Sequence, residues 1–173
     1  LSLATFEPWK PGMLSISVTM LELQRLGIDA PGVDELLYRR AMAAGRPVSG
    51  LETPRQQIEF IARMGEGEED ALLRQTLVEL GTLESDFDRM IAAWRSGNLK
   101  ALEALFIDPM RETSPRLYQT LLVKRNHAWL PKLKRLLASP PTELVVVGSA
   151  HLAGADGLIA RLRQAGLRVT RLR

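Results

Sequence analysis

The sequence contains no cysteine, which excludes disulfide bonds, thiolate catalysis and thiolate ligands for a metal ion. This absence fits an oxidising compartment as well as the cytosol and does not choose between them. Aromatic residues make up only 5% of the 173 residues, and none occurs in the arginine-rich segment over residues 161–173. Because nucleic-acid surfaces usually combine basic groups with stacking rings, we expect no nucleic-acid partner.

Long apolar runs are also missing from the chain. No run approaches the roughly 20 residues that a helix needs to cross a bilayer, so we expect no transmembrane segment. The first residue is Leu1 rather than methionine. We therefore expect a fragment of a longer protein, from which a targeting segment could have been removed.

Helices dominate the pattern, because Leu, Ala and Arg are abundant and all three favour helical structure. After a loop over residues 1–12, the spacing of apolar residues predicts helices over residues 13–26, 32–44, 68–80, 83–94, 98–106, 115–138 and 154–165. Another helix starts at Thr53, since Thr53 and Gln56 can form a capping box around Pro54. Pro131 should kink or break the longest helix.

Three short segments, residues 46–52, 143–148 and 167–172, are predicted to be buried strands. The expected fold is therefore α/β, a helix-rich layered domain with a small, mostly parallel sheet. We expect a single domain over residues 1–173, with a helical portion at 53–138 and a strand–helix–strand unit at 139–173. Three strands are few for this much helix, so either the helices form their own bundle or further strands precede Leu1.

Glu52 and His151 are the residues most suited to chemistry. Each follows a predicted strand and precedes a predicted helix. Ligand sites in open parallel sheets form beyond the carboxyl ends of the strands, so these two side chains should emerge on one edge. Imidazole and carboxylate together are common ligands of a divalent metal ion.

The simpler interpretation is that Glu52 lies on the surface and that His151 is structural. One histidine and one glutamate also fall short of the three protein ligands typical of a catalytic zinc site. The only other histidine, His127, lies within the long predicted helix, and we expect it on the surface.

Arg125 and Asn126 lie on the same predicted helix, with Trp129 one turn beyond Arg125. Arg125 could project into a cleft and hold a carboxylate. Alternatively, it could be a surface residue that extends over the Trp129 ring.

Several short motifs together resemble the TraB/PrgY/GumN family, which is related to the Tiki proteases. The matching motifs occur in family order across nearly the whole chain. They are Pro8-Trp9-Lys10, the Gly32–Leu37 segment, Gly50-Leu51-Glu52-Thr53 with Gln57, Trp94 with Gly97, Arg125-Asn126 with Trp129, and the Val147–Gly154 segment followed by Gly157-Leu158.

The resemblance implies an EreA/ChaN-like fold and assigns roles to several residues. The family has two Gly-x-x-His motifs with a glutamate between them. The stretch from Gly148 to His151 matches the second motif, and Glu52 matches the glutamate, so His151 and Glu52 are implied as metal ligands or catalytic residues. Arg125 and Asn126 are implied as members of the same cleft. The first motif is absent, so we expect this chain alone to be inactive.

The implied function is metal-dependent hydrolysis of a peptide, with Mn²⁺, Co²⁺ or Zn²⁺ polarising the scissile carbonyl. Glu52 would ligate the metal or take a proton from water, and Arg125 would stabilise negative charge. The alternative is a non-catalytic protein that binds a peptide or other ligand and is connected with pheromone control or polysaccharide production. A third candidate, a haem- or iron-handling protein, rests only on analogy of fold.

Localisation and assembly are likewise implied rather than read from the residues. The resemblance favours the periplasm or cell envelope and leaves the cytoplasm open. An exposed edge of the expected sheet would suit a homodimer. The substrate and the identity of the metal stay undefined.

Overall fold

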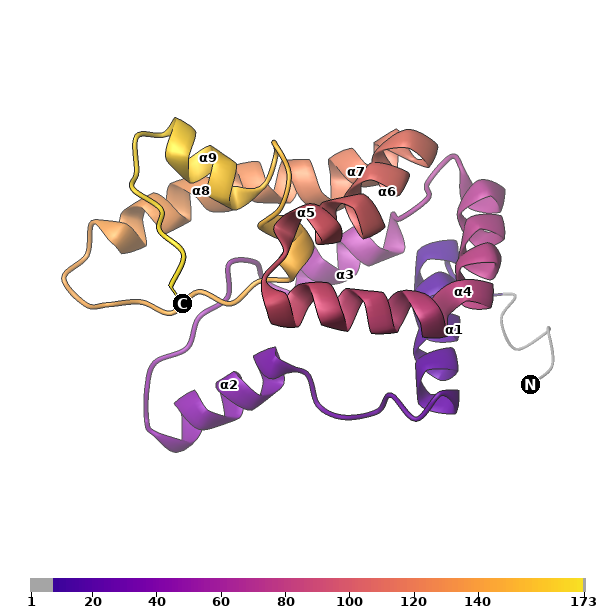
Figure 1. Cartoon of the computed structure of the whole chain (residues 1–173), viewed down its shortest axis with the longest axis horizontal. Coiled ribbons are helices and arrows are strands. Elements are labelled where there is room, and N and C mark those ends of the chain that lie inside the picture. Colours follow the sequence, from indigo (N-terminus) through magenta and orange to yellow (C-terminus); the bar gives the residue numbers. More distant parts are fainter. Residues whose placement is uncertain (1–7, 173) are drawn as a thin grey trace. The chain divides into compact units, whose positions relative to one another are not determined.

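A computed structural model describes residues 8–172, and Figure 1 labels its α-helices. These described residues are 67% helical. In chain order the elements are α1 (Pro11–Arg25), α2 (Val33–Ala43), α3 (Pro54–Ala62), α4 (Glu69–Ser96), α5 (Leu99–Leu102), the π-helix η2 (Glu103–Ile107), α6 (Asp108–Thr113), α7 (Pro115–Tyr118), the π-helix η3 (Gln119–Val123), α8 (Lys124–Leu137), the 3-10 helix η4 (Ser149–His151) and α9 (Leu158–Gln164). Among the described residues, no helix combines the length and apolar character needed to cross a bilayer.

The predicted α/β fold with a parallel sheet is wrong, because residues 8–172 contain no strand. The three segments predicted as strands, 46–52, 143–148 and 167–172, lie outside the helices and pair with no other strand in this part of the chain. Leu144, Val145 and Val146 are 76%, 39% and 43% exposed. Branched side chains favour an extended backbone, but a strand also needs a second backbone to accept and donate its hydrogen bonds.

Most of the predicted helices are confirmed, with shifted ends. Thr53 caps α3 as expected: the backbone N–H of Gln56 donates to the Thr53 hydroxyl over 3.2 Å, and the N–H of Thr53 donates to Gln56 Oε1 over 2.9 Å. The prediction of two helices at 68–80 and 83–94 is wrong, since α4 continues through Gly81. Pro131 lies inside α8 without ending it. Of the predicted loop over residues 1–12, residues 1–7 lie outside the described residues.

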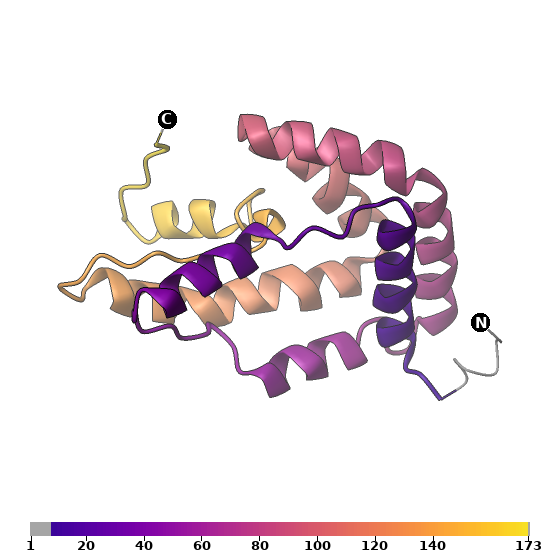
Figure 2. The ribbon, with the colours of Figure 1, turned by 90° about the horizontal axis from the view of Figure 1, so that it is seen from below.

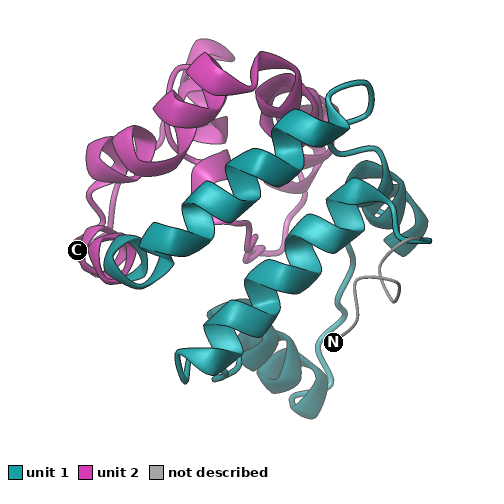
Figure 3. Cartoon of the chain, turned by 90° about the vertical axis from the view of Figure 1, so that its right-hand side faces the viewer, with its two compact units in different colours: residues 1–87 teal, residues 88–173 magenta. Residues whose placement is uncertain are grey.

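The chain divides into two compact units, residues 1–87 and 88–173 (Figure 3). The boundary falls within α4. The predicted single domain over residues 1–173, with a helical portion at 53–138 and a second portion at 139–173, stays a prediction. Only the strands expected within it are wrong. Each unit is described by itself below.

In the first unit, α1 packs closely on the helices that follow it. A Cβ atom at Gly12 would lie 2.1 Å from the Ile61 carbonyl oxygen and 2.8 Å from Met64 Cβ, so glycine permits α1 to approach the end of α3. Figure 2 shows α1 lying along the first part of α4. There the buried hydroxyls of Ser15 and Thr76 lie 2.8 Å apart and share a hydrogen bond. A close backbone contact and a polar pair therefore fix α1.

The second unit has an apolar core built on its π-helices. The core cluster consists of Ile107, Tyr118, Leu122, Val123 and Ala153. Its members come from η2, α7, η3 and the loop after η4. This packing places the end of η4 against the helical run from α7 to α8, which is where the candidate site lies.

Candidate functional site

His151 ends a single 3-10 turn and is buried, with 7% of its surface exposed. Its backbone N–H donates to the Gly148 carbonyl over 2.9 Å, which closes the turn. The turn directs the imidazole toward α8.

Asn126 on α8 is 1% exposed, and both its amide oxygen and its amide nitrogen form hydrogen bonds. Its Oδ1 lies 2.7 Å from His151 Nδ1. Its Nδ2 donates to the Asp156 carbonyl over 2.9 Å and to the His151 carbonyl over 3.4 Å. Because both carbonyls can only accept, the NH2 group must face them and Oδ1 must face the imidazole. Nδ1 of neutral His151 therefore carries the proton, and Nε2 carries the lone pair.

Trp129 and Arg125 complete this group, which we call the histidine cluster (Arg125, Asn126, Trp129 and His151). The Trp129 and His151 rings have centroids 4.4 Å apart at an interplanar angle of 44°. The Arg125 guanidinium carbon lies 4.9 Å from the Trp129 ring centroid, within range of a cation–π interaction. Arg125 therefore extends over Trp129, as one of the two alternatives predicted. Its charge also lies beside the ring that packs on His151.

A second polar group contacts the histidine cluster through the Asp156 carbonyl and was not predicted from the sequence. Asp156 accepts a hydrogen bond from the Tyr118 hydroxyl over 2.7 Å and pairs with the Arg161 guanidinium over 2.6 Å. Arg161 Nε also donates to the Asp156 carbonyl over 3.0 Å. Since Asn126 donates to that same carbonyl, the group links Arg161 and Tyr118 to the cluster. We call it the carboxylate network (Tyr118, Asp156 and Arg161).

Tyr118 shows the electrostatic effect of this arrangement. Burial of its phenol, followed by its hydrogen bond to Asp156, raises the pKa of Tyr118 to about 12. Both causes disfavour the phenolate, because it would be poorly solvated and would face a second negative charge. Tyr118 is therefore a neutral hydrogen-bond donor at physiological pH.

Glu52 belongs to the first unit and the histidine cluster to the second. Glu52 is partly buried and precedes the Thr53 cap of α3. Its predicted meeting with His151 stays a prediction. His127 is exposed on α8, which confirms its predicted surface position.

The described residues do not form a complete metal site around His151. Among residues 8–172 there is no group of three or more His, Asp or Glu side chains that could hold a metal ion. His151 offers one suitable nitrogen, and Glu52 is the second ligand expected from the sequence. Two ligands are too few for a typical catalytic zinc site.

The signal for the carboxylate network was present in the sequence but weak. Asp156 lies just before α9, where a carboxylate usually complements the helix dipole, and Arg161 follows within that helix. Nothing in the local pattern predicted that Tyr118, 38 positions earlier, would meet Asp156.

Comparison with known proteins identifies the family of this chain. The model of the TraB/PrgY/gumN family matches residues 1–171, essentially the whole chain. No curated protein and no solved structure matches the sequence.

Proposed function

Because the chain belongs to the TraB/PrgY/gumN family, we propose that it carries part of a peptide-hydrolysing site centred on His151. The observation that supports this most is the hydrogen bond of 2.7 Å between His151 Nδ1 and Asn126 Oδ1. A histidine that acts as a base or as a ligand needs a defined tautomer, and a partner on the other ring nitrogen provides it.

In this proposal, His151 Nε2 takes a proton from the attacking water as the water oxygen bonds to the peptide carbonyl carbon. When the carbon–nitrogen bond breaks, the proton passes from Nε2 to the leaving amine. Asn126 is a positioning residue, since it acts on the reaction only through the orientation of the imidazole. Arg125 supplies positive charge beside the cluster, which would stabilise the negative oxygen of the intermediate.

Dependence on Mn²⁺, Co²⁺ or Zn²⁺ stays a prediction of the sequence, with His151 and Glu52 as its ligands. The described donors do not make a complete metal site. The proposal therefore assigns no reaction step to a metal ion. A peptide substrate and a location in the cell envelope also stay predictions.

The test compares His151→Gln with His127→Gln in the longest protein that contains this chain. Peptides are incubated with each protein, with and without the three metal ions, and the products are identified by mass spectrometry. We expect His151→Gln to lower cleavage at least about 100-fold, the lower range for loss of a general base, and His127→Gln to leave it unchanged. Equal cleavage by both variants would rule out the role of His151. Peptides that bind but stay intact would favour the non-catalytic binding protein.

A second measurement does not depend on activity. Long-range proton–nitrogen NMR spectra of the chain distinguish the two tautomers of each histidine. We expect His151 to carry its proton on Nδ1 and to change tautomer ratio in Asn126→Ala. A proton on Nε2 in the unmodified chain would contradict the assignment.

A further inference from the structure

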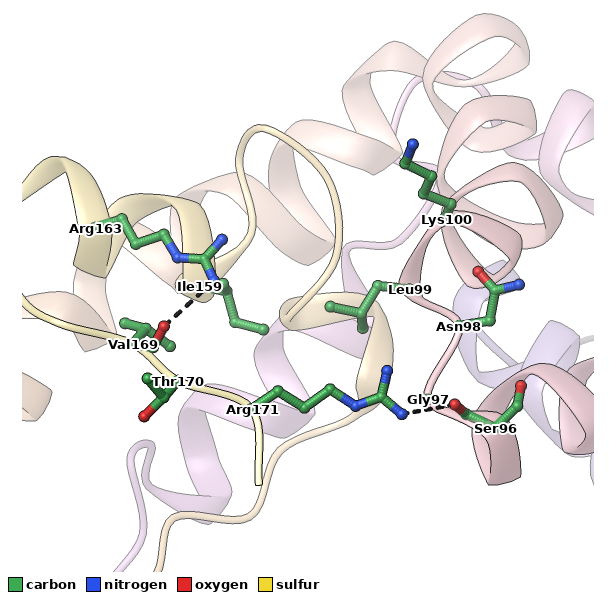
Figure 4. Close-up of a pocket in the computed structure, with 10 residues that line it drawn as sticks. All are labelled: Ser96, Gly97, Asn98, Leu99, Lys100, Ile159, Arg163, Val169, Thr170 and Arg171. Carbon is green, nitrogen blue, oxygen red and sulfur yellow. Dashed lines mark hydrogen bonds between the residues drawn. The ribbon is translucent and has the colours of Figure 1, made fainter. Parts of the chain in front are cut away.

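The second unit contains a hollow, separate from the histidine cluster, that combines apolar and cationic groups. Its volume is about 640 Å³, within the range of small-molecule pockets. Figure 4 shows its lining, which comes from the end of α4, from α5, from α9 and from the extended C-terminal segment. The chain segments that form it lie about 60 residues apart in sequence, between residues 96–100 and 159–171.

The floor of the hollow is apolar and is formed by Leu99, Ile159 and Val169. All three are partly exposed rather than buried. Thus an apolar group that entered the hollow would cover side chains that otherwise contact water, which favours binding in proportion to the area covered.

Two guanidinium groups flank this floor. Arg171 Nη2 donates to the Ser96 carbonyl over 2.7 Å, and Arg163 Nη2 donates to the Val169 carbonyl over 3.3 Å. Each bond uses one of five guanidinium N–H groups and fixes the direction of the rest. Neither arginine forms an ion pair with a carboxylate in the described part of the chain.

The position of Arg171 depends on Gly97. A Cβ atom at Gly97 would lie 2.6 Å from Arg171 Nη2 and 2.9 Å from its guanidinium carbon, and Gly97 has a φ of 62°. The glycine therefore ends α4 in a left-handed conformation and also makes room for the guanidinium. In this space the hydrogen bond to the Ser96 carbonyl keeps the Arg171 guanidinium beside the hollow.

We propose that this hollow binds a carboxylate that carries an adjacent apolar side chain, as at the free C-terminus of a peptide ending in leucine. The planar fork of a guanidinium matches a carboxylate, and the rim adds the charge of Lys100. None of the ten lining residues that Figure 4 shows is acidic, so nothing in that set repels an anion. The proposal goes beyond the proposed function and holds even if His151 takes no part in hydrolysis.

The same chemistry is available from a peptide C-terminus and from a free aliphatic acid, so the experiment uses both. The full 173-residue chain, labelled with ¹³C at its methyl groups, is titrated with N-acetyl-Ala-Ala-Leu, with its C-terminal amide, with hexanoate and with inorganic phosphate. We expect the methyl signals of Leu99 and Ile159 to shift when the peptide acid is added. The dissociation constant from these shifts should be at least tenfold lower for the peptide acid than for its amide. Shifts with hexanoate as well would identify a free acid as an equal source of the carboxylate.

The double variant Arg163→Gln/Arg171→Gln should lose at least tenfold in affinity for the peptide acid. Arg95→Gln/Arg135→Gln is the matched control, because it removes the same charge from two exposed arginines outside the hollow and should change affinity less than twofold. Circular dichroism verifies that both variants are folded. Arg171→Lys is a milder second variant, because it keeps the positive charge but removes the planar guanidinium group. Equal binding of acid and amide, phosphate binding as tight as that of the peptide acid, or no binding at millimolar concentration would each overturn the proposal.

Discussion

Replacing Asn126 with alanine tests the hydrogen bonds around His151 directly. The substitution removes an amide that is 1% exposed and serves three partners: His151 Nδ1 and the carbonyls of Asp156 and His151. Two of these bonds are short. Loss of the bond to His151 Nδ1 leaves a buried donor without a partner, which costs about 1–3 kcal/mol, whereas the Asp156 carbonyl keeps its bond from Arg161 Nε and loses only about 1 kcal/mol. We therefore expect Asn126→Ala to lower the free energy of unfolding by about 2–4 kcal/mol, a large part of the 5–15 kcal/mol typical of a native protein.

The assay is urea unfolding followed by circular dichroism. With a denaturant slope of about 2 kcal/mol per molar, the midpoint should fall by about 1–2 M. The matched control is Asn98→Ala, which removes an exposed asparagine that caps α5 by accepting a hydrogen bond from the Ala101 N–H over 3.1 Å. That loss should be about 1 kcal/mol, or about 0.5 M in the midpoint.

Asn126→Asp separates the hydrogen bonds from the volume of the side chain. Aspartate keeps the size and one acceptor but cannot donate to the two carbonyls, and its charge would be buried. We expect it to destabilise the chain about as much as alanine near neutral pH. If Asn126→Ala cost no more than Asn98→Ala, the argument for a fixed amide orientation, and with it the tautomer of His151, would be refuted.

Three further predictions concern the packing and the carboxylate network. In urea unfolding, Gly12→Ala should destabilise the first unit by about 1–3 kcal/mol, because the new Cβ atom would overlap the backbone at the end of α3. Gly81→Ala is the control: its Cβ atom would meet no atom within 4 Å, so it should stabilise α4 by about 0.5–1 kcal/mol. Absorbance titration should show a tyrosine with a pKa near 12, and this titration should be absent from Tyr118→Phe. Because folding raises the pKa of Tyr118, the stability that its phenol contributes is present below pH 10 and is lost as the pH rises toward 12. The shared hydrogen bond of Ser15 and Thr76 should make the combined effect of Ser15→Ala and Thr76→Val differ from the sum of the single effects by about 0.5–1 kcal/mol.

Local signals in the sequence were reliable where the determinants lie close together in the chain. Thr53, Pro54 and Gln56 predicted the start of α3 because all the atoms of a capping box lie within one turn. Asn126 and His151 were expected to share a cleft only through the resemblance to a family, and the structure brings them into contact. The hydrogen bond could not be predicted from spacing, because it joins segments 25 positions apart.

The failures have a common physical cause, which is that an isolated segment does not specify its partner. Leu144, Val145 and Val146 carry the pattern of a buried strand and are exposed. Gly81 marked a break between helices, yet a single glycine costs a helix only about 1 kcal/mol and α4 continues through it. The contacts of Asp156 likewise depend on Tyr118 and Asn126, which lie 38 and 30 positions from it in the sequence.

The π-helix η3 (Gln119–Val123) has a consequence for how this chain can vary. A π-turn holds one residue more than the α-helix around it, so it behaves as an insertion that has been absorbed without breaking the helix. Deleting one residue from it would restore ordinary α-helical winding and, because the wider turn had already absorbed the extra residue, would leave α8 in nearly the same rotational position relative to α7. Asn126 lies three positions beyond this π-helix and would still face His151. We therefore expect relatives to tolerate the loss of one residue from this stretch while they keep the asparagine.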